Sequence, residues 1–419
     1  MLDNGRKYDG QKPRILYIDM AYTLKMVRER GLEQEFNARN CGGYFDYVWG
    51  VHPMANIPEK RNPTYEGFRV SQVEFSESQT IIEGSSAYYR FLKFLYHINF
   101  FVSQIRFIIF LIRLVKRERI SIIMSTDPYF SGLIGLSVKL FTNAKLVIWV
   151  IANYDLIYKA TGIIAMPRLF KWRWVEKLIE RITFKGADLV AGGNQDNLEY
   201  ALNNGGNLKK STVFPVGKLI HRKHLREPVL RERDEIFSKS KAIYHFVYVG
   251  RLIELKYPDD VLRAFEMIAK EIPNCALIIA GEGPMRSELE KMASDMNIAY
   301  KVYFLGNINQ LRLANLLAGC FVVLSPATGR SLIECSLAGL PIVAYELDWQ
   351  PEFIARDGAG IIVPFRDWQK MAEAAVHLIQ YPEEARKMGE SSRRTGLEAC
   401  DSDKLYGHER TEFDKLLKR

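Results

Sequence analysis

The sequence predicts an α/β protein made of two doubly wound Rossmann-like domains that face each other across a central cleft. Its 419 residues are too many for one ordinary hydrophobic core. Short apolar runs rich in β-branched residues alternate with helical segments in both halves, which indicates mostly parallel sheets covered on both faces. Glycines follow several of these runs, where a strand turns toward a helix. In such domains ligands bind at the carboxyl ends of the strands.

One break in this alternation suggests the domain boundaries. Lys, Arg and His crowd residues 215–241, and Pro215 and Pro228 interrupt that stretch. We therefore expect four units: an N-terminal Rossmann-like domain at 1–216, an interdomain linker at 217–241, a C-terminal Rossmann-like domain at 242–396, and a C-terminal helix at 397–419 that can return to the N-terminal domain.

The composition indicates a soluble globular protein with anionic partners. Hydrophobic residues make up 48% of the chain and charged residues 26%, which is ordinary for a soluble domain. The net charge of +9 favours nucleotide phosphates, nucleic acid or an anionic membrane face, but no nucleic-acid recognition motif is present. The five cysteines are scattered without a CxxC pair, so we expect neither zinc nor a disulfide framework, and a reducing cytosol. The N-terminus lacks the apolar core of a signal peptide.

The first half begins with a strand after Pro13 and continues as alternating strands and helices. The strand candidates are residues 14–19, 45–51, 120–125, 145–151 and 187–191. Residues 54–85 are polar and irregular, and we expect a loop region there.

Two helical segments of this half combine basic and aromatic residues. One runs from about Tyr88 to Arg119 and the other from Arg168 to Phe184, with Trp172 and Trp174 among its basic residues. The first contains too many charged and polar groups to span a bilayer, which needs roughly 20 mostly apolar residues. We favour helices packed on a sheet with solvated basic faces. The alternative is that both lie on an anionic membrane surface.

The second half repeats the pattern, and its organising stretch runs from Thr328 to Tyr345. The strand candidates of this half are residues 245–249, 276–280, 302–305, 321–325, 341–345 and 360–363. Within the organising stretch Gly329 precedes a short helix, and Pro341 follows it. A helix N-terminus suits an anion such as phosphate, and Glu334 can reach a hydroxyl near that anion.

Four turns of the second half should border the same crevice because each follows the carboxyl end of a strand. Their residues are Gly250, Arg251, Gly281, Glu282, Gly283, Gly306, Asn307, Thr328, Gly329, Arg330 and Ser331. Glycine lets backbone N–H groups approach a phosphate closely. Arg251 can bind a phosphate bidentately, and Lys256, five positions later, supplies a compact point charge. Each turn alone is a weak signal, but their order and spacing are specific.

This ordered set carries a family resemblance. The matching motifs are Val249-Gly250-Arg251, Lys256, Gly281-Glu-Gly-Pro284, Phe304-Leu-Gly306, Glu334, Ala338-Gly339-Leu-Pro341-Ile-Val-Ala344 and Gly358-Ala-Gly360-Ile-Ile-Val-Pro364. From Tyr248 to Asp367 the chain resembles the nucleotide-sugar-binding domain of family 4 glycosyltransferases of the GT-B fold. The first half fits the family outline more loosely.

The resemblance implies an enzyme that moves a sugar from a nucleotide diphosphate to an acceptor with retention, using a UDP- or GDP-sugar and no cofactor. In the family the residues matching Arg251 and Lys256 hold the diphosphate leaving group, and no metal is required because their charge stabilises the departing phosphate. The residue matching Glu334 binds the ribose hydroxyls. Backbone N–H groups from Gly329 to Ser331 would meet the donor sugar or phosphate.

The sequence departs from the family at two places. In the family a second glutamate is usual eight positions before the glutamate that binds the ribose. Pro326 occupies that position here, so we expect Thr328 or Arg330 to contact the donor sugar instead. A histidine is usual after the strand at 145–151, where this chain has Ala152-Asn153-Tyr154-Asp155. Asn153 or Asp155 is then the candidate for contacting the sugar.

The expected function is therefore glycosyl transfer, with the acceptor in the N-terminal domain. We expect a lipid-linked glycan or growing polysaccharide, as in lipopolysaccharide or capsule synthesis, because the basic, aromatic first half suits an anionic membrane face. The expected location is the cytoplasm, including the inner face of the membrane. Two alternatives stay open: a sugar-nucleotide epimerase or phosphorylase of the same fold, and an inactive relative that binds nucleotide or glycan.

Overall fold

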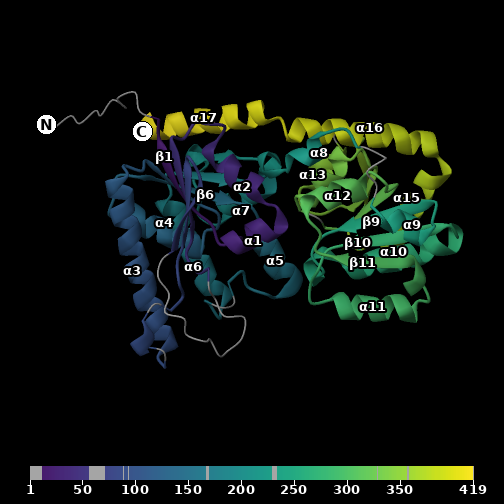
Figure 1. Cartoon of the computed structure of the whole chain (residues 1–419), viewed down its shortest axis with the longest axis horizontal. Coiled ribbons are helices and arrows are strands. Elements are labelled where there is room, and N and C mark those ends of the chain that lie inside the picture. The colour runs from purple at the N-terminus through teal and green to yellow at the C-terminus, as the bar shows by residue number, and fades with distance from the viewer. Residues whose placement is uncertain are drawn as a thin grey trace.

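The described part of the chain forms two α/β domains that lie side by side (Figure 1). The computed structural model describes residues 12–55, 71–87, 89–92, 94–166, 169–228, 234–327, 329–355 and 358–418. The last strand of the first sheet ends at Val213, and the first strand of the second begins at Tyr244. The ranges expected for the domains and the linker stay a prediction.

The N-terminal sheet has eight strands in the order β3-β4-β2-β1-β5-β6-β7-β8. Their bounds are β1 Arg14–Ile18, β2 Tyr47–His52, β3 Ser71–Ser76, β4 Gln79–Glu83, β5 Ile122–Ser125, β6 Lys145–Val150, β7 Leu189–Gly192 and β8 Ser211–Val213. All neighbours pair in parallel except β3 and β4, which form an antiparallel edge pair.

The expectation of a loop over residues 54–85 is wrong for its second part, because β3 and β4 lie there; residues 56–70 are outside the described residues. β3 alternates half-buried and exposed positions at the sheet edge, so it carries no apolar run. β4 is buried, yet its first two residues are the polar Gln79 and Thr80. Only Ile81 and Ile82 gave an apolar signal, which is too short to indicate a strand.

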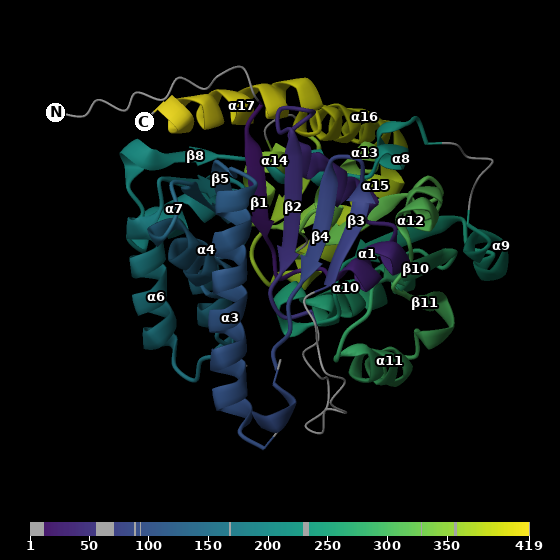
Figure 2. The same cartoon turned by 60° about the vertical axis from the view of Figure 1, so that its left-hand side comes forward.

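Helices cover both faces of this sheet. The helices of the N-terminal half are α1 Leu24–Arg30, α2 Glu33–Asn37, α3 Tyr96–Arg117, α4 Phe130–Leu140, α5 Tyr154–Thr161, α6 Arg173–Gly186 and α7 Gln195–Asn203, with short 3₁₀ turns at Ala38–Asn40, Arg90–Leu92 and Leu208–Lys210. α4 lies between α3 and α6 (Figure 2). Phe107, Leu111 and Ile134 of this layer share a buried core with Leu16 and Ile18 of β1.

Contrary to the expectation that its charged and polar groups are too many for a span, helix α3 has the length and composition of a membrane-crossing helix, alone among the helices of the described ranges. In its most apolar window 39% of the helix is buried inside the protein. A core helix of a soluble protein meets the same test, so this finding is weak evidence for a span. The expected helix from Tyr88 to Arg119 begins later, at Tyr96, and Tyr88 itself lies outside the described residues.

The C-terminal sheet has six parallel strands in the order β11-β10-β9-β12-β13-β14. Their bounds are β9 Tyr244–Val249, β10 Cys275–Ala280, β11 Val302–Gly306, β12 Val322–Ser325, β13 Ile342–Tyr345 and β14 Gly360–Val363. The helices and short turns of this half are α8 Arg222–Leu225, α9 Ile236–Ser240, α10 Pro258–Glu271, α11 Arg286–Asp295, α12 Gln310–Leu317, α13 Ser331–Leu337, α14 Gln350–Ala355 and α15 Trp368–Gln380, with 3₁₀ turns at Val216–Leu219, Glu254–Lys256 and Ala299–Lys301. One buried core joins the sheet to α10, α11 and α15, and the other joins it to α12, α13 and α14.

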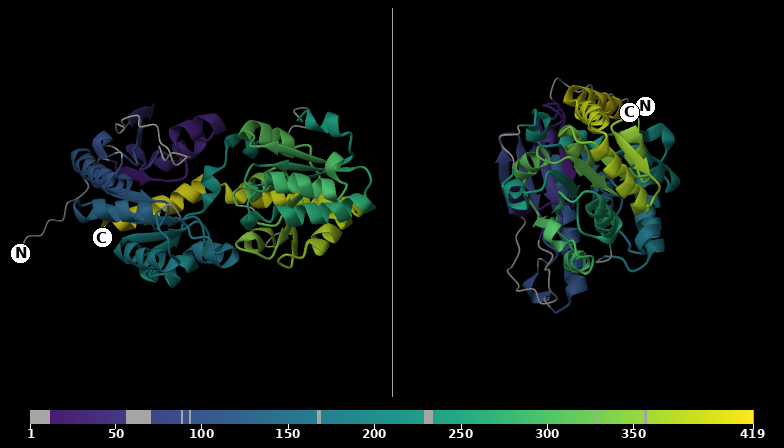
Figure 3. Two further views of the ribbon diagram at one scale, coloured as in Figure 1. Left: turned by 90° about the horizontal axis from the view of Figure 1, so that it is seen from below. Right: turned by 90° about the vertical axis from the view of Figure 1, so that its right-hand side faces the viewer.

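The C-terminal segment ties the two domains together along one edge of the molecule (Figures 1 and 3). α16, Pro382–Ala399, packs on α13 of the second domain, and α17, Ser402–Lys418, packs on the first sheet through Phe413 and Leu416. The buried carboxylate of Glu409 in α17 pairs with the buried ammonium of Lys218 at 2.5 Å. This segment therefore contacts both domains and joins them.

Candidate functional site

A cavity of about 1270 Å³ lies between the two domains and is lined by residues of both. On the C-terminal side its walls come from the segments that follow β9, β10, β11, β12 and β13. On the N-terminal side they come from the segments that follow β6 and β7. The carboxyl ends of two parallel sheets thus face one space, as the sequence predicted for the ligand site.

A cationic corner of the cavity is formed by Arg251 and Lys256. Gly250 and Arg251 follow β9, and Lys256 ends the 3₁₀ turn Glu254–Lys256. The Tyr248 hydroxyl donates to the Arg251 carbonyl at 3.0 Å, which fixes the loop against the strand. Arg251 is exposed to the cavity and Lys256 is half-buried. Neither forms a salt bridge with any residue that the structure describes, so both charges are available to an anion.

The electrostatics of Lys256 reflect this crowding of positive charge. Burial and the neighbouring Arg251 lower its pKa, Asp348 opposes both effects, and the net pKa of Lys256 is about 8. An anion bound beside Lys256 relieves the repulsion from Arg251 and favours the charged ammonium. The corner is therefore built to take up negative charge.

The glycine turns let three strand ends approach one another. A Cβ on Gly281 would lie 1.8 Å from the Gly250 carbonyl oxygen, so only glycine fits between these turns. Gly306 adopts φ +66°, the left-handed region. Gly281, Gly306 and Asn307 line the cavity. Gly283 does not, because it packs against the Leu252 carbonyl.

Glu282 is also turned away from the cavity. Its carboxylate pairs with Arg286 of α11 at 2.6 Å, and Arg286 reaches on to Glu290 at 2.9 Å. The structure therefore does not bring Glu282 to the cavity, although the sequence predicted it to be a binding residue.

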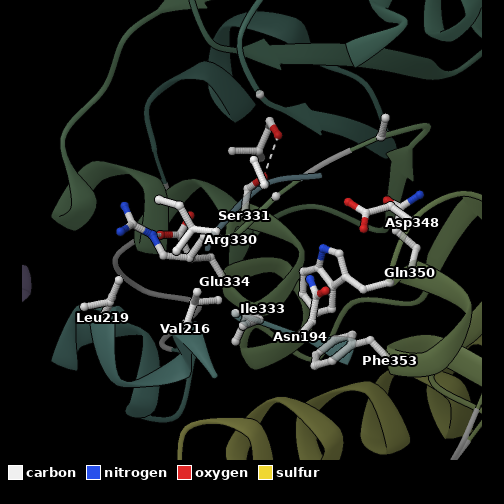
Figure 4. Close-up of a pocket in the computed structure, with 18 of the residues that line it drawn as sticks. Asn194, Val216, Leu219, Arg330, Ser331, Ile333, Glu334, Asp348, Gln350 and Phe353 are labelled. Atoms are coloured by element: carbon white, nitrogen blue, oxygen red, sulfur yellow. Dashed lines mark hydrogen bonds and ion pairs between the residues drawn. The ribbon is translucent and has the colours of Figure 1, made fainter. Parts of the chain in front are cut away.

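The start of α13 forms one end of the cavity (Figure 4). Gly329, Arg330, Ser331 and Glu334 line it, and the Ser331 hydroxyl donates to the Val249 carbonyl at 2.9 Å. Glu334 is buried, with its Oε1 3.7 Å from Arg330 Nε. Thr328, which the sequence also predicted for this site, lies outside the described residues.

Arg330 makes a contact between the domains that the sequence did not indicate. Its Nη1 lies 2.5 Å from Oε1 of the buried Glu35 in α2. Burial raises the pKa of Glu35, while the Arg330 guanidinium acts in the opposite direction. Arg330 is therefore held between Glu35 and Glu334, and a role in binding the donor sugar would require it to leave at least one of them.

On the N-terminal side, Asn153 and Asp155 have different surroundings. Asn153 caps α5, accepts from the Leu156 N–H at 3.2 Å, and lines the cavity. Asp155 does not line it. The Asp155 carboxylate accepts from Arg173 at 2.8 Å and from Lys177 at 2.5 Å. Although burial alone would raise its pKa, these bonds keep the pKa of Asp155 below its usual value. The structure therefore does not bring Asp155 to the cavity, and its carboxylate instead anchors α5 on α6.

Sequence reasoning missed an acidic group at the other end of the cavity. Asp348 lines the cavity three positions after the end of β13, and Asp196 of α7 faces it from the N-terminal domain (Figure 4 labels Asp348). Burial and the nearby Asp196 raise the pKa of Asp348 to about 6, although Lys256 acts in the opposite direction. The available signal was an acid three positions after a predicted strand, but no glycine marks that turn. Among the described residues no group of three or more His, Cys, Asp or Glu is placed to hold a metal ion.

Comparisons with known proteins agree with this architecture. Residues 231–395 match the family model described as glycosyl transferases group 1. An uncharacterized glycosyltransferase of Methanocaldococcus jannaschii is 26% identical over 224 residues, which cover 52% of this chain and 52% of that protein. A GDP-mannose-dependent alpha-(1-6)-phosphatidylinositol monomannoside mannosyltransferase of Mycolicibacterium smegmatis is 29% identical over 163 residues, covering 36% and 43%. These matches span about half or less of the length of the curated relatives.

The whole fold resembles solved structures at low sequence identity. Sucrose-phosphate synthase from Thermosynechococcus elongatus aligns over 96% of this chain and 99% of its own, with a TM-score of 0.74 and 17% identity. HepE of Anabaena, solved in complex with UDP-glucose, aligns over 96% and 99%, with a TM-score of 0.69 and 13% identity. The resemblance noted in the sequence and the two-domain fold are thereby confirmed. The chain therefore has the two-domain GT-B fold, and its residues 231–395 match the model of the glycosyl transferases group 1 family.

Proposed function

We propose that this protein is a glycosyltransferase that moves a sugar from a nucleotide-diphosphate sugar to an acceptor held by the N-terminal domain. The observation that carries the proposal is the cationic corner: Arg251 and Lys256 stand beside the glycine turns at Gly250 and Gly281, in a cavity shared by both domains. A diphosphate fits this corner because backbone N–H groups can approach it and two cations can neutralise it.

In the proposed reaction the diphosphate is the leaving group. The bond between the anomeric carbon and a phosphate oxygen breaks, the acceptor oxygen bonds to that carbon, and the acceptor proton is released. Arg251 and Lys256 stabilise the charge that grows on the departing phosphate, so we propose transfer without a metal and, by family resemblance, with retention. The buried Glu334 binds the ribose hydroxyls. The donor is a UDP- or GDP-sugar: HepE was solved in complex with UDP-glucose, and the mycobacterial relative is named as a GDP-mannose-dependent enzyme.

The acceptor in this proposal is a lipid-linked glycan or a growing polysaccharide, such as lipopolysaccharide or capsule, on an anionic membrane. Support comes from α3 and α6, whose positions Figure 2 shows, because both helices expose apolar and basic side chains. The exposed apolar residues are Ile98, Phe101, Ile105, Ile109, Trp172, Trp174, Leu178 and Ile182. The exposed basic residues are Arg106, Arg113, Lys116, Arg117, Lys171, Arg181 and Lys185. The mycobacterial relative is named for a phosphatidylinositol-linked acceptor.

A donor screen tests the enzymatic proposal. Nucleotide sugars that bind the native state raise the melting temperature, so a panel of UDP- and GDP-sugars identifies the donor. The donor is then supplied with candidate acceptors in excess chelator, and we expect transfer to persist. Turnover of the donor without any acceptor would favour an epimerase or phosphorylase. Nucleotide binding without turnover across the panel would favour an inactive relative, and loss of transfer that Mg²⁺ or Mn²⁺ restores would refute the metal-free mechanism.

A vesicle experiment tests the membrane surface. Attraction to anionic lipid is worth about 1 kcal/mol per basic residue near the surface and weakens with salt. We expect the protein to sediment with phosphatidylserine vesicles at low salt and to be released at high salt. The double variant Trp172→Ser/Trp174→Ser should bind less. Tyr300→Ser is the matched control because Tyr300 is an exposed aromatic of the other domain. Protein that stays in the supernatant at low salt would show that these faces are only solvated.

A further inference from the structure

The acid at one end of the cavity, Asp348, stands next to the cation that we assign to the diphosphate. Asp348 and Lys256 both line the cavity, and each influences the charge of the other. The 3₁₀ turn that carries Lys256 packs against α5 of the N-terminal domain, so this part of the cavity is narrow. In a nucleotide sugar the transferred sugar is bonded directly to the second phosphate. A sugar whose phosphate contacts Lys256 is therefore within reach of Asp348.

The backbone holds Asp348 in a conformation that few residues adopt. Its φ is +55°, in the left-handed region. Such strain persists only where the surroundings impose it, and it is concentrated at functional sites. Here the neighbouring Gln350 fixes the loop: its amide donates to the Pro326 carbonyl at 3.0 Å and its Oε1 accepts from the Ser325 hydroxyl at 3.1 Å. Asp348 is thus held beside the loop that follows β12.

The group opposite Asp348 is equally well positioned. Asp196 lies in the first turn of α7, and the Asn153 amide donates to its Oδ2 at 3.0 Å. Its carboxyl faces that of Asp348, and burial, together with the nearby Asp196, raises the pKa of Asp348 to about 6. At neutral pH Asp348 therefore presents mainly a carboxylate, whose oxygens accept hydrogen bonds from hydroxyl groups of a sugar.

We propose that Asp348, positioned by Asp196, binds hydroxyl groups of the donor's sugar and so selects which sugar is transferred. The inference rests on the proposed function and adds to it a carboxylate from a loop that the sequence left unassigned. When the sugar binds, its hydroxyls donate to the Asp348 carboxylate. The nucleotide itself makes no contact with the pair, since its phosphates are held by Arg251 and Lys256 and its ribose by Glu334.

The test separates the sugar from the nucleotide. Calorimetry gives the Kd of the wild-type protein for UDP, for GDP, and for the nucleotide sugar that binds tightest in the donor panel. We expect Asp348→Asn to weaken the nucleotide sugar by about tenfold or more, because a hydrogen bond to a charged group is lost. Its Kd for the bare nucleoside diphosphate should change by less than about twofold. Glu346→Gln is the matched control, since Glu346 is an exposed acid of the same loop that does not line the cavity.

The alternative is that the pair only joins the two domains. Asn at position 348 can donate its amide N–H to Asp196, so a purely structural pair would leave both affinities as in the wild type. Equal weakening of nucleotide and nucleotide sugar would also overturn the inference, because the sugar would then have no special contact. Failure of the wild-type protein to bind UDP or GDP at all would instead refute the proposed function. Asp196→Asn should weaken the nucleotide sugar less than Asp348→Asn, since it acts through its partner.

Discussion

Lys256 should give the reaction a limit at alkaline pH. Because burial and Arg251 lower its pKa to about 8, Lys256 loses its charge within the range in which most enzymes are stable. Only the charged ammonium attracts the diphosphate, so donor capture is greatest well below pH 8, is half of that at pH 8 and falls above it. With a pKa of about 8, roughly nine in ten molecules carry the charge at pH 7 and roughly one in ten at pH 9. We expect kcat/KM for the donor to fall about tenfold per pH unit above 8.

The loss is large because the charge acts in a partly enclosed site. Two unit charges about 4 Å apart interact by roughly 4 kcal/mol at the effective dielectric constant near a protein surface. Removal of one group that stabilises a developing oxyanion typically costs about 100- to 1,000-fold in turnover. Lys256→Ala should therefore show low turnover at every pH. Its pH profile of kcat/KM should lack the decline above pH 8 that Lys256 causes, which we call the alkaline limb.

The assay is the pH profile of kcat/KM for the donor, which reports groups of the free enzyme. Lys256→Arg keeps its charge at all accessible pH values and should move the limb above pH 10. Asp348→Asn removes the negative charge that raises the pKa of Lys256, so its limb should move to lower pH. An active Lys256→Arg variant with the limb still near pH 8 would assign the limb to another group and refute the reasoning.

Two further predictions concern carboxylates in buried positions. Glu334→Gln should raise the donor KM about tenfold and change kcat less, because ribose hydroxyls are bound equally in ground and transition states; steady-state kinetics with varied donor measures this, and an unchanged KM would remove Glu334 from the site. Glu409→Gln leaves the buried Lys218 ammonium without its partner and should lower the free energy of unfolding by about 3–5 kcal/mol in urea titrations. The control is Glu390→Gln, which breaks an exposed ion pair with Arg386. This substitution should change the free energy of unfolding by less than about 1 kcal/mol.

The strands of the fold were predictable from the sequence where burial is complete. β9 and β10 are buried along nearly their whole length, so each gives an unbroken apolar run that indicates a buried strand. β3 lies at a sheet edge and β4 begins with polar residues, so neither gives such a run. The two-domain architecture followed from the alternation, which depends on local patterns that each half contains by itself.

The site was predictable only on the side where its residues are close in sequence to strand ends. Gly250, Arg251 and Lys256 follow one strand directly, and topology alone brings them to the cavity. Asp155 also follows a strand, yet its carboxylate points into the network with Arg173 and Lys177. A strand-end position therefore indicates proximity to a cleft but not the direction of the side chain, which packing decides.

The contacts between the domains could not be predicted from the sequence, because their partners belong to segments that fold separately. Glu35 and Arg330 attract each other at one end of the cavity, and Asp196 faces Asp348 at the other. A ligand that enters between them must exchange its own hydrogen bonds for these contacts. The affinity for a donor therefore depends on how the two domains meet, which no motif within one domain records.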